Sequence, residues 1–180
     1  MKRILKLVLA IILFIALGAL AAYGYQNMLS PKLNVELLNL STSTLTGSAK
    51  VTSEAKISSN SFSDLGIKLL ISGDAVSYTF DIKNTGSKDV SITDVVKGTP
   101  TCTGIDSDST KASSDASIVC DGLAYTLQYT DSKEDLKAGD TIKVGESKNV
   151  TLTISYAGDN LPDNGVNISN INFNMTFKYN

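Results

Sequence analysis

GDAVSYTFDIKNTGSKDVSITDVV, residues 73–96, is the stretch that decides the fold of this chain. Apolar side chains occupy every second position of its first half: Val76, Tyr78, Phe80 and Ile82. This period of two is typical of a β-strand with one buried and one solvent-exposed face. Asn-Thr-Gly at 84–86 follows, and Asn and Gly tolerate the positive φ that a tight reversal needs. Because the alternation resumes after this turn, the stretch predicts a β-hairpin at the centre of an all-β domain.

The same alternation recurs along the rest of the chain. It predicts further strands at 33–40, 49–57, 66–71, 124–129, 141–144, 150–156 and 171–179. Polar and Gly-containing breaks such as 41–47 separate them, so we expect eight or nine strands in total. This spacing is typical of a sandwich or barrel, and we predict an all-β domain of Ig-like or jelly-roll type over residues 33–180. Its core should contain alternating residues from several strands: Val76, Tyr78, Phe80, Ile82, Leu152, Ile154, Phe173 and Phe177.

The composition limits the chemistry of the chain. It has 180 residues, a formal net charge of −2 and no histidine. Nucleic-acid phosphates require Lys and Arg patches, and the sequence has no such cluster, so we expect no nucleic-acid partner. The absence of histidine excludes Ser-His-Asp and Cys-His catalysis and His-ligated metal sites within the chain. We therefore expect no enzyme activity and no cofactor.

The first 24 residues are typical of an export segment. Three basic residues lie within 1–6, residues 7–24 are uncharged, and Ala-Leu-Ala at 19–21 fits a cleavage site. A cleaved signal peptide and an uncleaved membrane anchor both fit, since the uncharged run would be about 27 Å long as a helix. Residues 25–32 follow as a linker. Under both interpretations the domain is exported, to the cell surface or the extracellular space, and an uncleaved helix would make the membrane its partner.

Two cysteines flank an unusual segment. Residues 97–119 are rich in Gly, Thr, Ser and Asp and poor in apolar residues, which predicts a long exposed loop. In an exported chain, Cys102 and Cys120 predict a disulfide that staples this loop, with two free thiols as the alternative. The bond would contribute roughly 3 kcal/mol to the free energy of unfolding.

Three patterns suggest chemistry, and each has a simpler interpretation. Carboxylates in and near the loop could gather around Ca²⁺, but the loop lacks the Gly and bidentate Glu of a dedicated calcium loop, which favours solvated side chains: Asp106, Asp108, Asp115 and Asp121. Residues 53–56 match the S-x-x-K of penicillin-recognising enzymes without the two companion motifs, which indicates a chance match. Two carboxylates would suffice for a glycosidase, but the acidic residues lie in turns and on exposed faces.

The central pattern also resembles a known family. It reads G-D-x-V-x-Y-x-F-x-I-x-N-x-G at 73–86 and G-E-x-x-x-V-x-L at 145–152. This resembles the Ig-like modules of bacterial surface proteins, of the CARDB and related kinds, and it implies the fold only. With the short N-terminal apolar segment, the chain is also similar to the TasA/camelysin group of Gram-positive exported matrix proteins. That group has Pro-Gly-Asp where this chain has Ser-Gly-Asp at 72–74, and camelysin-type protease activity is not carried over because no metal-binding motif is present.

Together these features predict a non-enzymatic exported surface protein, either a matrix or fibre subunit or a membrane-tethered domain. The alternative is an adhesin or accessory binding module that uses the 97–119 loop. Self-assembly is a further expectation, because 171–179 and 33–40 look like poorly protected edge strands. Donation of 33–40 to a neighbour would propagate as a fibre, and pairing within its own domain is the alternative.

Overall fold

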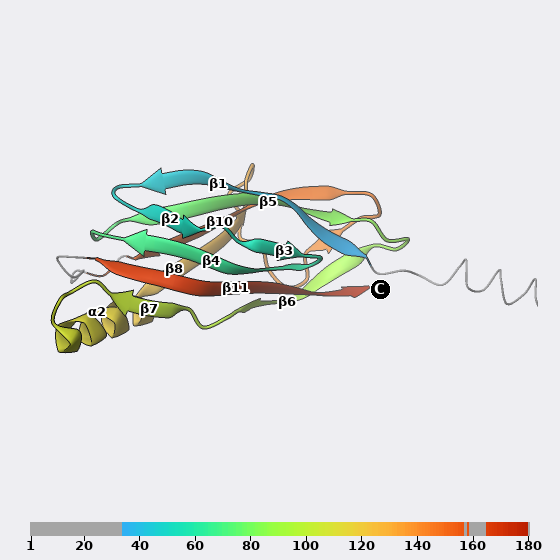
Figure 1. Ribbon diagram of the computed structural model, residues 1–180. Helices are drawn as coiled ribbons and strands as arrows, with labels where there is room; N and C mark the ends of the chain where they lie inside the picture. The colour runs from blue at the N-terminus through green and yellow to red at the C-terminus, as the bar shows by residue number, and fades with distance from the viewer. Residues whose placement is uncertain (1–33, 157, 159–164, 180) are drawn as a thin grey trace, which may run out of the picture. The chain divides into compact units, whose positions relative to one another are not determined.

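The computed structural model describes residues 34–156, 158 and 165–179, which form two antiparallel β-sheets and one helix (Figure 1). The smaller sheet has four strands in the order β1–β5–β10–β8. Their bounds are Val35–Thr46 for β1, Ala75–Asn84 for β5, Ser147–Tyr156 for β10 and Leu123–Tyr129 for β8. The all-β prediction is therefore correct in its coarse form.

The larger sheet contains seven strands, two pairs of which act as single broken strands. β2 (Lys50–Ser53) and β3 (Lys56–Ser58) both pair with β4 (Ser61–Leu69), and β6 (Val90–Lys97) and β7 (Thr101–Gly104) both pair with β11 (Val166–Tyr179). β11 pairs with β4 on its other side, and β9 (Thr141–Ile142) pairs with β6. The described residues thus hold eleven strands rather than eight or nine, because the predicted strand at 49–57 is interrupted and β7 was not predicted.

The core lies between the two sheets and is built from the alternating residues of their inner faces. Phe62 of β4 stacks on Phe173 of β11 with ring centroids 5.2 Å apart and meets Phe80 of β5 edge-on at 5.8 Å. Seven of the eight predicted core residues are buried, and Phe177 is only partly buried. Phe177 follows a register shift between β11 and β6 and lies near the end of β11, where the core is less enclosed.

The predicted hairpin at 73–96 is wrong. β5 belongs to the smaller sheet and β6 to the larger one, so the connection between them crosses from one sheet to the other (Figure 1). Alternation identifies a strand and its buried face, but it does not say which strand is the neighbour. The turn residues at 84–86 form an arch between sheets instead of a hairpin loop.

Two predicted boundaries also change. β1 continues through the predicted break at 41–47. Its second half, residues 41–46, is held by backbone pairing with β5 although its side chains are exposed. β11 begins at Val166 and lies between two strands of the larger sheet, so the prediction of an edge strand at 171–179 is wrong. β1 is an edge strand, and within this chain it pairs with β5.

The predicted loop at 97–119 is largely ordered secondary structure. It contains β7 and most of helix α2 (Ser109–Asp121), which lie together at one end of the sheets (Figure 1). Asp108 caps the helix, since its carboxylate accepts hydrogen bonds from the backbone N–H groups of Thr110 and Lys111. Composition alone missed this helix because it buries little besides Val119 and has no apolar stripe.

Several predictions concern residues outside the described part of the chain. The signal peptide or anchor at 1–24 and the linker at 25–32 both lie there, as does the start of the predicted strand at Leu33. Among the residues that are described, no helix has the length and apolar character needed to cross a membrane.

Candidate functional site

The cysteines are placed as the sequence predicts. Cys102 of β7 and Cys120 of α2 form a disulfide with their Cα atoms 5.9 Å apart. The bond fastens the helix to a strand of the larger sheet. Neither cysteine lies in the groove described below, and the disulfide's place in the fold indicates a structural staple.

The aspartates that could have formed a calcium site lie apart in other local environments. Asp108 caps α2, Asp106 forms an ion pair with Lys111 at 3.1 Å, and Asp115 is buried on the helix. Within the described ranges, no three carboxylate, Cys or His side chains converge as metal ligands. The two residues of the S-x-x-K match likewise make structural contacts with Asp64. Ser53 donates to the Asp64 carbonyl, and Lys56 forms an ion pair with the Asp64 carboxylate at 3.0 Å.

A buried carboxylate stands just before β5. Asp74 is fully buried, and its two oxygens accept hydrogen bonds from the backbone N–H groups of Ser48, Leu70 and Ile71 at 2.7–3.0 Å. Gly47 passes so close, with φ of +67°, that a side chain there would collide with this carboxylate. Asp74 therefore joins the end of β1 to the β4–β5 turn, a role that the sequence did not reveal beyond marking a turn.

A buried amide stands at the other end of β5. The Asn84 side chain donates to the carbonyls of Lys88 and Ile142 and accepts from the Gly86 N–H, at 2.8–3.0 Å. These bonds satisfy its donors and its oxygen in a site that solvent does not reach. Asn84 thus holds the arch that carries the chain from one sheet to the other.

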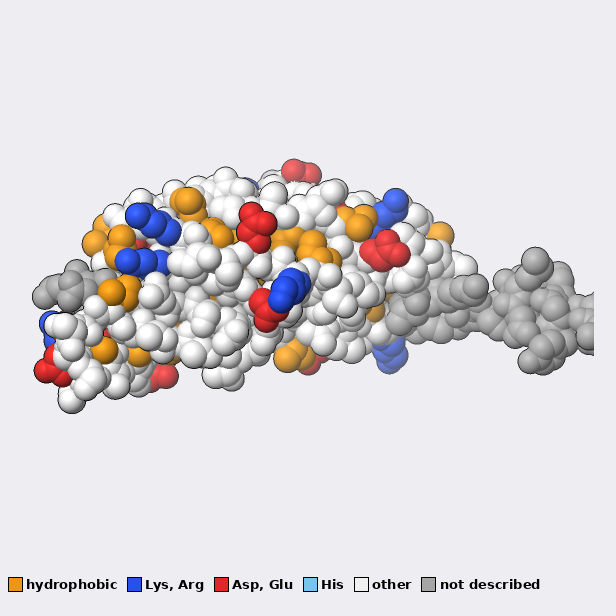
Figure 2. Space-filling model, viewed as in Figure 1, with side chains coloured by type: hydrophobic (Ala, Val, Ile, Leu, Met, Phe, Trp, Pro, Cys, Tyr) orange, Lys and Arg blue, Asp and Glu red, His pale blue; other side chains and the backbone are white. Residues whose placement is uncertain are grey.

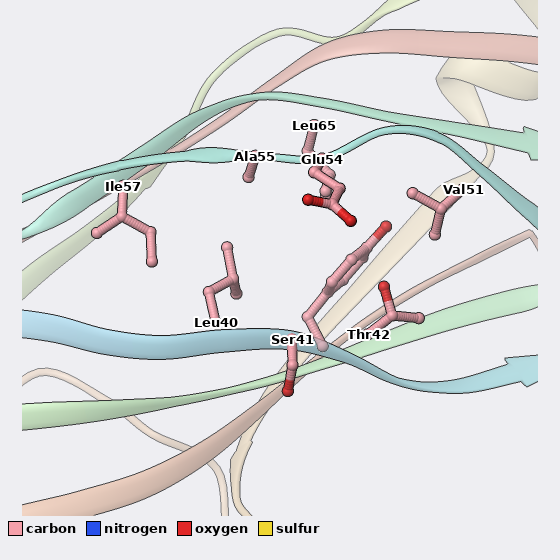
Figure 3. Close-up of a pocket in the computed structure, with 9 residues that line it drawn as sticks. Leu40, Ser41, Thr42, Val51, Glu54, Ala55, Ile57 and Leu65 are labelled. Carbon is pink, nitrogen blue, oxygen red and sulfur yellow. The ribbon is translucent and has the colours of Figure 1, made fainter.

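A groove opens between the edges of the two sheets. It has a volume of about 280 Å³ and lies between β1 on one side and β2, β3 and their connection on the other. Figure 3 shows Leu40 facing Ala55 and Ile57 across it, while the Ser41 side chain points away. Apolar side chains also show in the surface between β1 and β3 (Figure 2), where the rest of the visible face is mainly uncharged and polar. The groove is thus an opening at the sandwich edge that is lined by both apolar and polar groups.

Tyr78 of β5 lines the inner side of this groove. Its side chain is buried, with 3% of the residue exposed, and its hydroxyl has almost no accessible surface and no hydrogen-bond partner among the described residues. Burial raises the pKa of the Tyr78 phenol well above its ordinary value. The sequence predicted Tyr78 as a core residue, but its alternation could not show that the hydroxyl would lack a partner.

Two other tyrosines give a contrast. Tyr129 donates its hydroxyl to Asp140 at 2.9 Å, and burial, reinforced by this bond, raises its pKa. Tyr125 lies under the Lys97 ammonium, 5.0 Å from the ring centroid, and its hydroxyl has no partner in the described structure. Tyr125 is only half-buried and lies outside the groove, so of these two unpartnered hydroxyls in the described part of the chain, that of Tyr78 is the one beside the groove.

Comparisons of the chain with protein-family models, with curated proteins and with solved structures give no match in any of the three. They neither support nor contradict the resemblance to CARDB-like and TasA-like proteins, which stays a prediction from the residues.

Proposed function

We propose that this chain is a non-enzymatic exported surface protein that serves as a structural or matrix subunit or as a membrane-tethered Ig-like domain. The observation that carries the proposal is the disulfide between Cys102 and Cys120. Disulfides persist in oxidising compartments outside the cytoplasm and are rare within it. The basic and then apolar sequence of residues 1–24 supports the same compartment independently.

Assembly through β1 is the mechanism we propose for a structural role. β1 is an edge strand that contacts β5 on one side, and residues 41–47 at its outer half are exposed. Two register shifts also interrupt its pairing with β5. An edge strand close to the start of the domain, with irregular pairing, is suited to exchange for the same strand of a neighbouring copy.

Electron microscopy of the purified protein tests this proposal. We expect filaments from the full chain and only unassembled particles from a variant that lacks residues 22–40. That variant should recover its missing strand from a synthetic peptide of the same sequence added in trans. If the deleted variant assembles as well as the full chain, donation is wrong. Reduced cysteines in protein taken directly from cells would contradict export.

The alternative is an adhesin or accessory binding module that uses residues 97–119, which contain β7 and most of α2. Its support is that α2 is fixed by the disulfide at one end of the sheets and that Ile118 is 43% exposed on it. A protein that stays monomeric and binds cells or a glycan, with binding lost on Ile118→Asp, would favour this alternative over the matrix role.

A further inference from the structure

The groove beside Tyr78 lies between two irregular strand edges. The pairing of β1 with β5 shifts register between Leu38 and Ser41 and again between Thr42 and Thr44. On the opposite wall, the strand beside β4 is interrupted at 54–55, between β2 and β3. Bulges and interruptions of this kind re-aim side chains and separate neighbouring strands, and they are common beside functional sites. Both walls of the groove are therefore built from departures from regular pairing.

The Tyr78 hydroxyl is the one feature of β5 that the fold leaves incomplete. Asp74 and Asn84, the buried polar residues that flank the same strand, make three hydrogen bonds each. Among the described residues the Tyr78 hydroxyl makes none, and its oxygen has almost no solvent-accessible surface. A buried donor without an acceptor is unfavourable, and such a group in a folded protein calls for an explanation.

The lining of the groove indicates which ligand would supply the bond. Five apolar side chains contribute to the walls: Leu40, Val51, Ala55, Ile57 and Leu65. Among the described lining residues Glu54 carries the one charge, and its carboxylate points into the groove (Figure 3). An anionic head group would be repelled by Glu54, whereas a hydroxyl could accept from Tyr78 and donate to Glu54. Glu54 is exposed, so its long side chain can change rotamer to open the Tyr78 hydroxyl to such a group while its carboxylate accepts the bond from the ligand.

We propose that this groove binds a small molecule with an apolar chain and a terminal hydroxyl, an aliphatic alcohol. The hydroxyl bridges Tyr78 and Glu54, and the chain lies along the apolar walls between β1 and β3. The volume of about 280 Å³ sets the size, since it equals the liquid volume of about nine water molecules and suits a chain of six to eight carbons. This inference is independent of the proposed matrix role.

Nuclear magnetic resonance of the full chain, titrated with 1-hexanol, tests the proposal residue by residue. We expect saturable shifts of backbone amides in β1, β2, β3 and the middle of β5, with weak affinity in keeping with so small a ligand. Absence of saturable shifts at these amides up to the solubility of hexanol would overturn the proposal. Groove shifts that depend on protein concentration without any alcohol would show a second copy as the occupant, and would overturn it too.

Variants then test the two polar contacts. Tyr78→Phe keeps the ring and should weaken hexanol binding about fivefold, as expected for one lost hydrogen bond. Tyr125→Phe is the matched control, because it removes another unpartnered hydroxyl outside the groove, and it should leave binding unchanged. Equal affinities for the wild type and Tyr78→Phe would overturn the role of the hydroxyl.

Ligand charge gives a second, independent readout. Hexanoate should bind the wild type at least tenfold more weakly than hexanol, and Glu54→Gln should narrow that difference by raising the affinity for hexanoate. Glu54 is exposed, so the substitution leaves the fold intact. Ala55→Leu should block both ligands by filling the groove. Hexanoate that binds as tightly as hexanol to the wild type would show that Glu54 does not select the head group.

Discussion

Buried polar side chains at the two ends of β5 are hydrogen-bonded, whereas the buried hydroxyl in its middle has no partner among the described residues. Asp74 before the strand and Asn84 at its end are enclosed by protein, and each makes three hydrogen bonds that connect separate segments. Tyr78, between them, is equally buried and makes none through its hydroxyl. A satisfied buried group specifies the fold, whereas an unsatisfied one costs stability and is retained for another reason or by accident. The comparison predicts that the ends of β5 determine stability and that its middle does not depend on the hydroxyl.

The largest expected effect on stability comes from the buried aromatic side chain of β5, Phe80. Phe80→Ala should lower the free energy of unfolding by about 3–5 kcal/mol, because Phe80 is fully buried and joins the sheets through its contact with Phe62. Urea unfolding monitored by circular dichroism measures the loss. Phe177→Ala is the control and should cost about 1–2 kcal/mol, since Phe177 is only partly buried. A loss below about 1 kcal/mol for Phe80→Ala would show that the buried face of β5 is misassigned.

The next effect is expected at the start of β5. Asp74→Ala should cost about 3 kcal/mol, because three backbone N–H groups in part-buried bonds lose their charged acceptor together. The same unfolding experiment applies, with Asp89→Ala as control. Asp89 is exposed and accepts a bond from the Val144 N–H at 2.9 Å, so its removal should have little effect. If Asp74→Ala and Asp89→Ala lower the free energy of unfolding equally, the buried carboxylate contributes no more to stability than a surface one.

The arch at the far end of β5 should be less costly to disturb. Asn84→Ala leaves two carbonyls and one N–H without partners, and we expect a loss of about 2–3 kcal/mol. Asn149→Ala is the control, because Asn149 is exposed and its side chain donates to Asp81 at the surface. Hydrogen exchange should also locate the effect at 84–90. A loss spread evenly over both sheets would mean that Asn84 does not act on the arch in particular.

The smallest effect is expected in the middle of the strand. Tyr78→Phe should leave the free energy of unfolding at pH 7 unchanged or raise it by up to about 1 kcal/mol, because it removes a buried hydroxyl that makes no bond. Tyr129→Phe should cost about 1 kcal/mol, since it removes the bond to Asp140. If Tyr78→Phe is as costly as Tyr129→Phe, the Tyr78 hydroxyl has a partner in solution and the comparison along β5 fails.

The stability of the protein at alkaline pH tests the burial of the Tyr78 hydroxyl. Burial raises the pKa of Tyr78 above its ordinary value of 10, so the unfolded chain loses this proton before the folded chain does. The stability that Tyr78 contributes is complete below about pH 10 and declines as the pH rises further. Between pH 8 and pH 11 the wild type should therefore lose about 1 kcal/mol more than Tyr78→Phe does, as measured by urea unfolding at each pH. Parallel declines in the two proteins would contradict the assigned burial.

Much of this molecule follows from local sequence pattern, and the exceptions share a cause. The buried faces of β5 and β10 were predicted correctly because alternation reports directly on burial. The hairpin at 73–96 was wrong because the partner of a strand depends on contacts distant in sequence. Helix α2 was missed because its turns are stabilised by the Asp108 cap and the disulfide rather than by an amphipathic pattern.

The candidate site shows the same division. Cys102 and Cys120 were predicted as a pair from their number and the export signal, without geometry. The groove was not predicted, since its walls come from β1 and from the β2–β3 interruption, whose meeting depends on how the two sheets close at their edges. Glu54 and Tyr78 are 24 positions apart and carry no motif.

The sequence by itself therefore determined the class of fold, the buried faces of the central strands and the pairing of the cysteines, because period, composition and cysteine number act locally or through simple counts. Only the tertiary structure decided which sheet each strand joins, which end of the sheets carries α2, and which buried polar groups have partners. Those properties depend on the directions in which side chains from distant segments meet, and hydrogen bonds require distances and angles that no one-dimensional pattern contains.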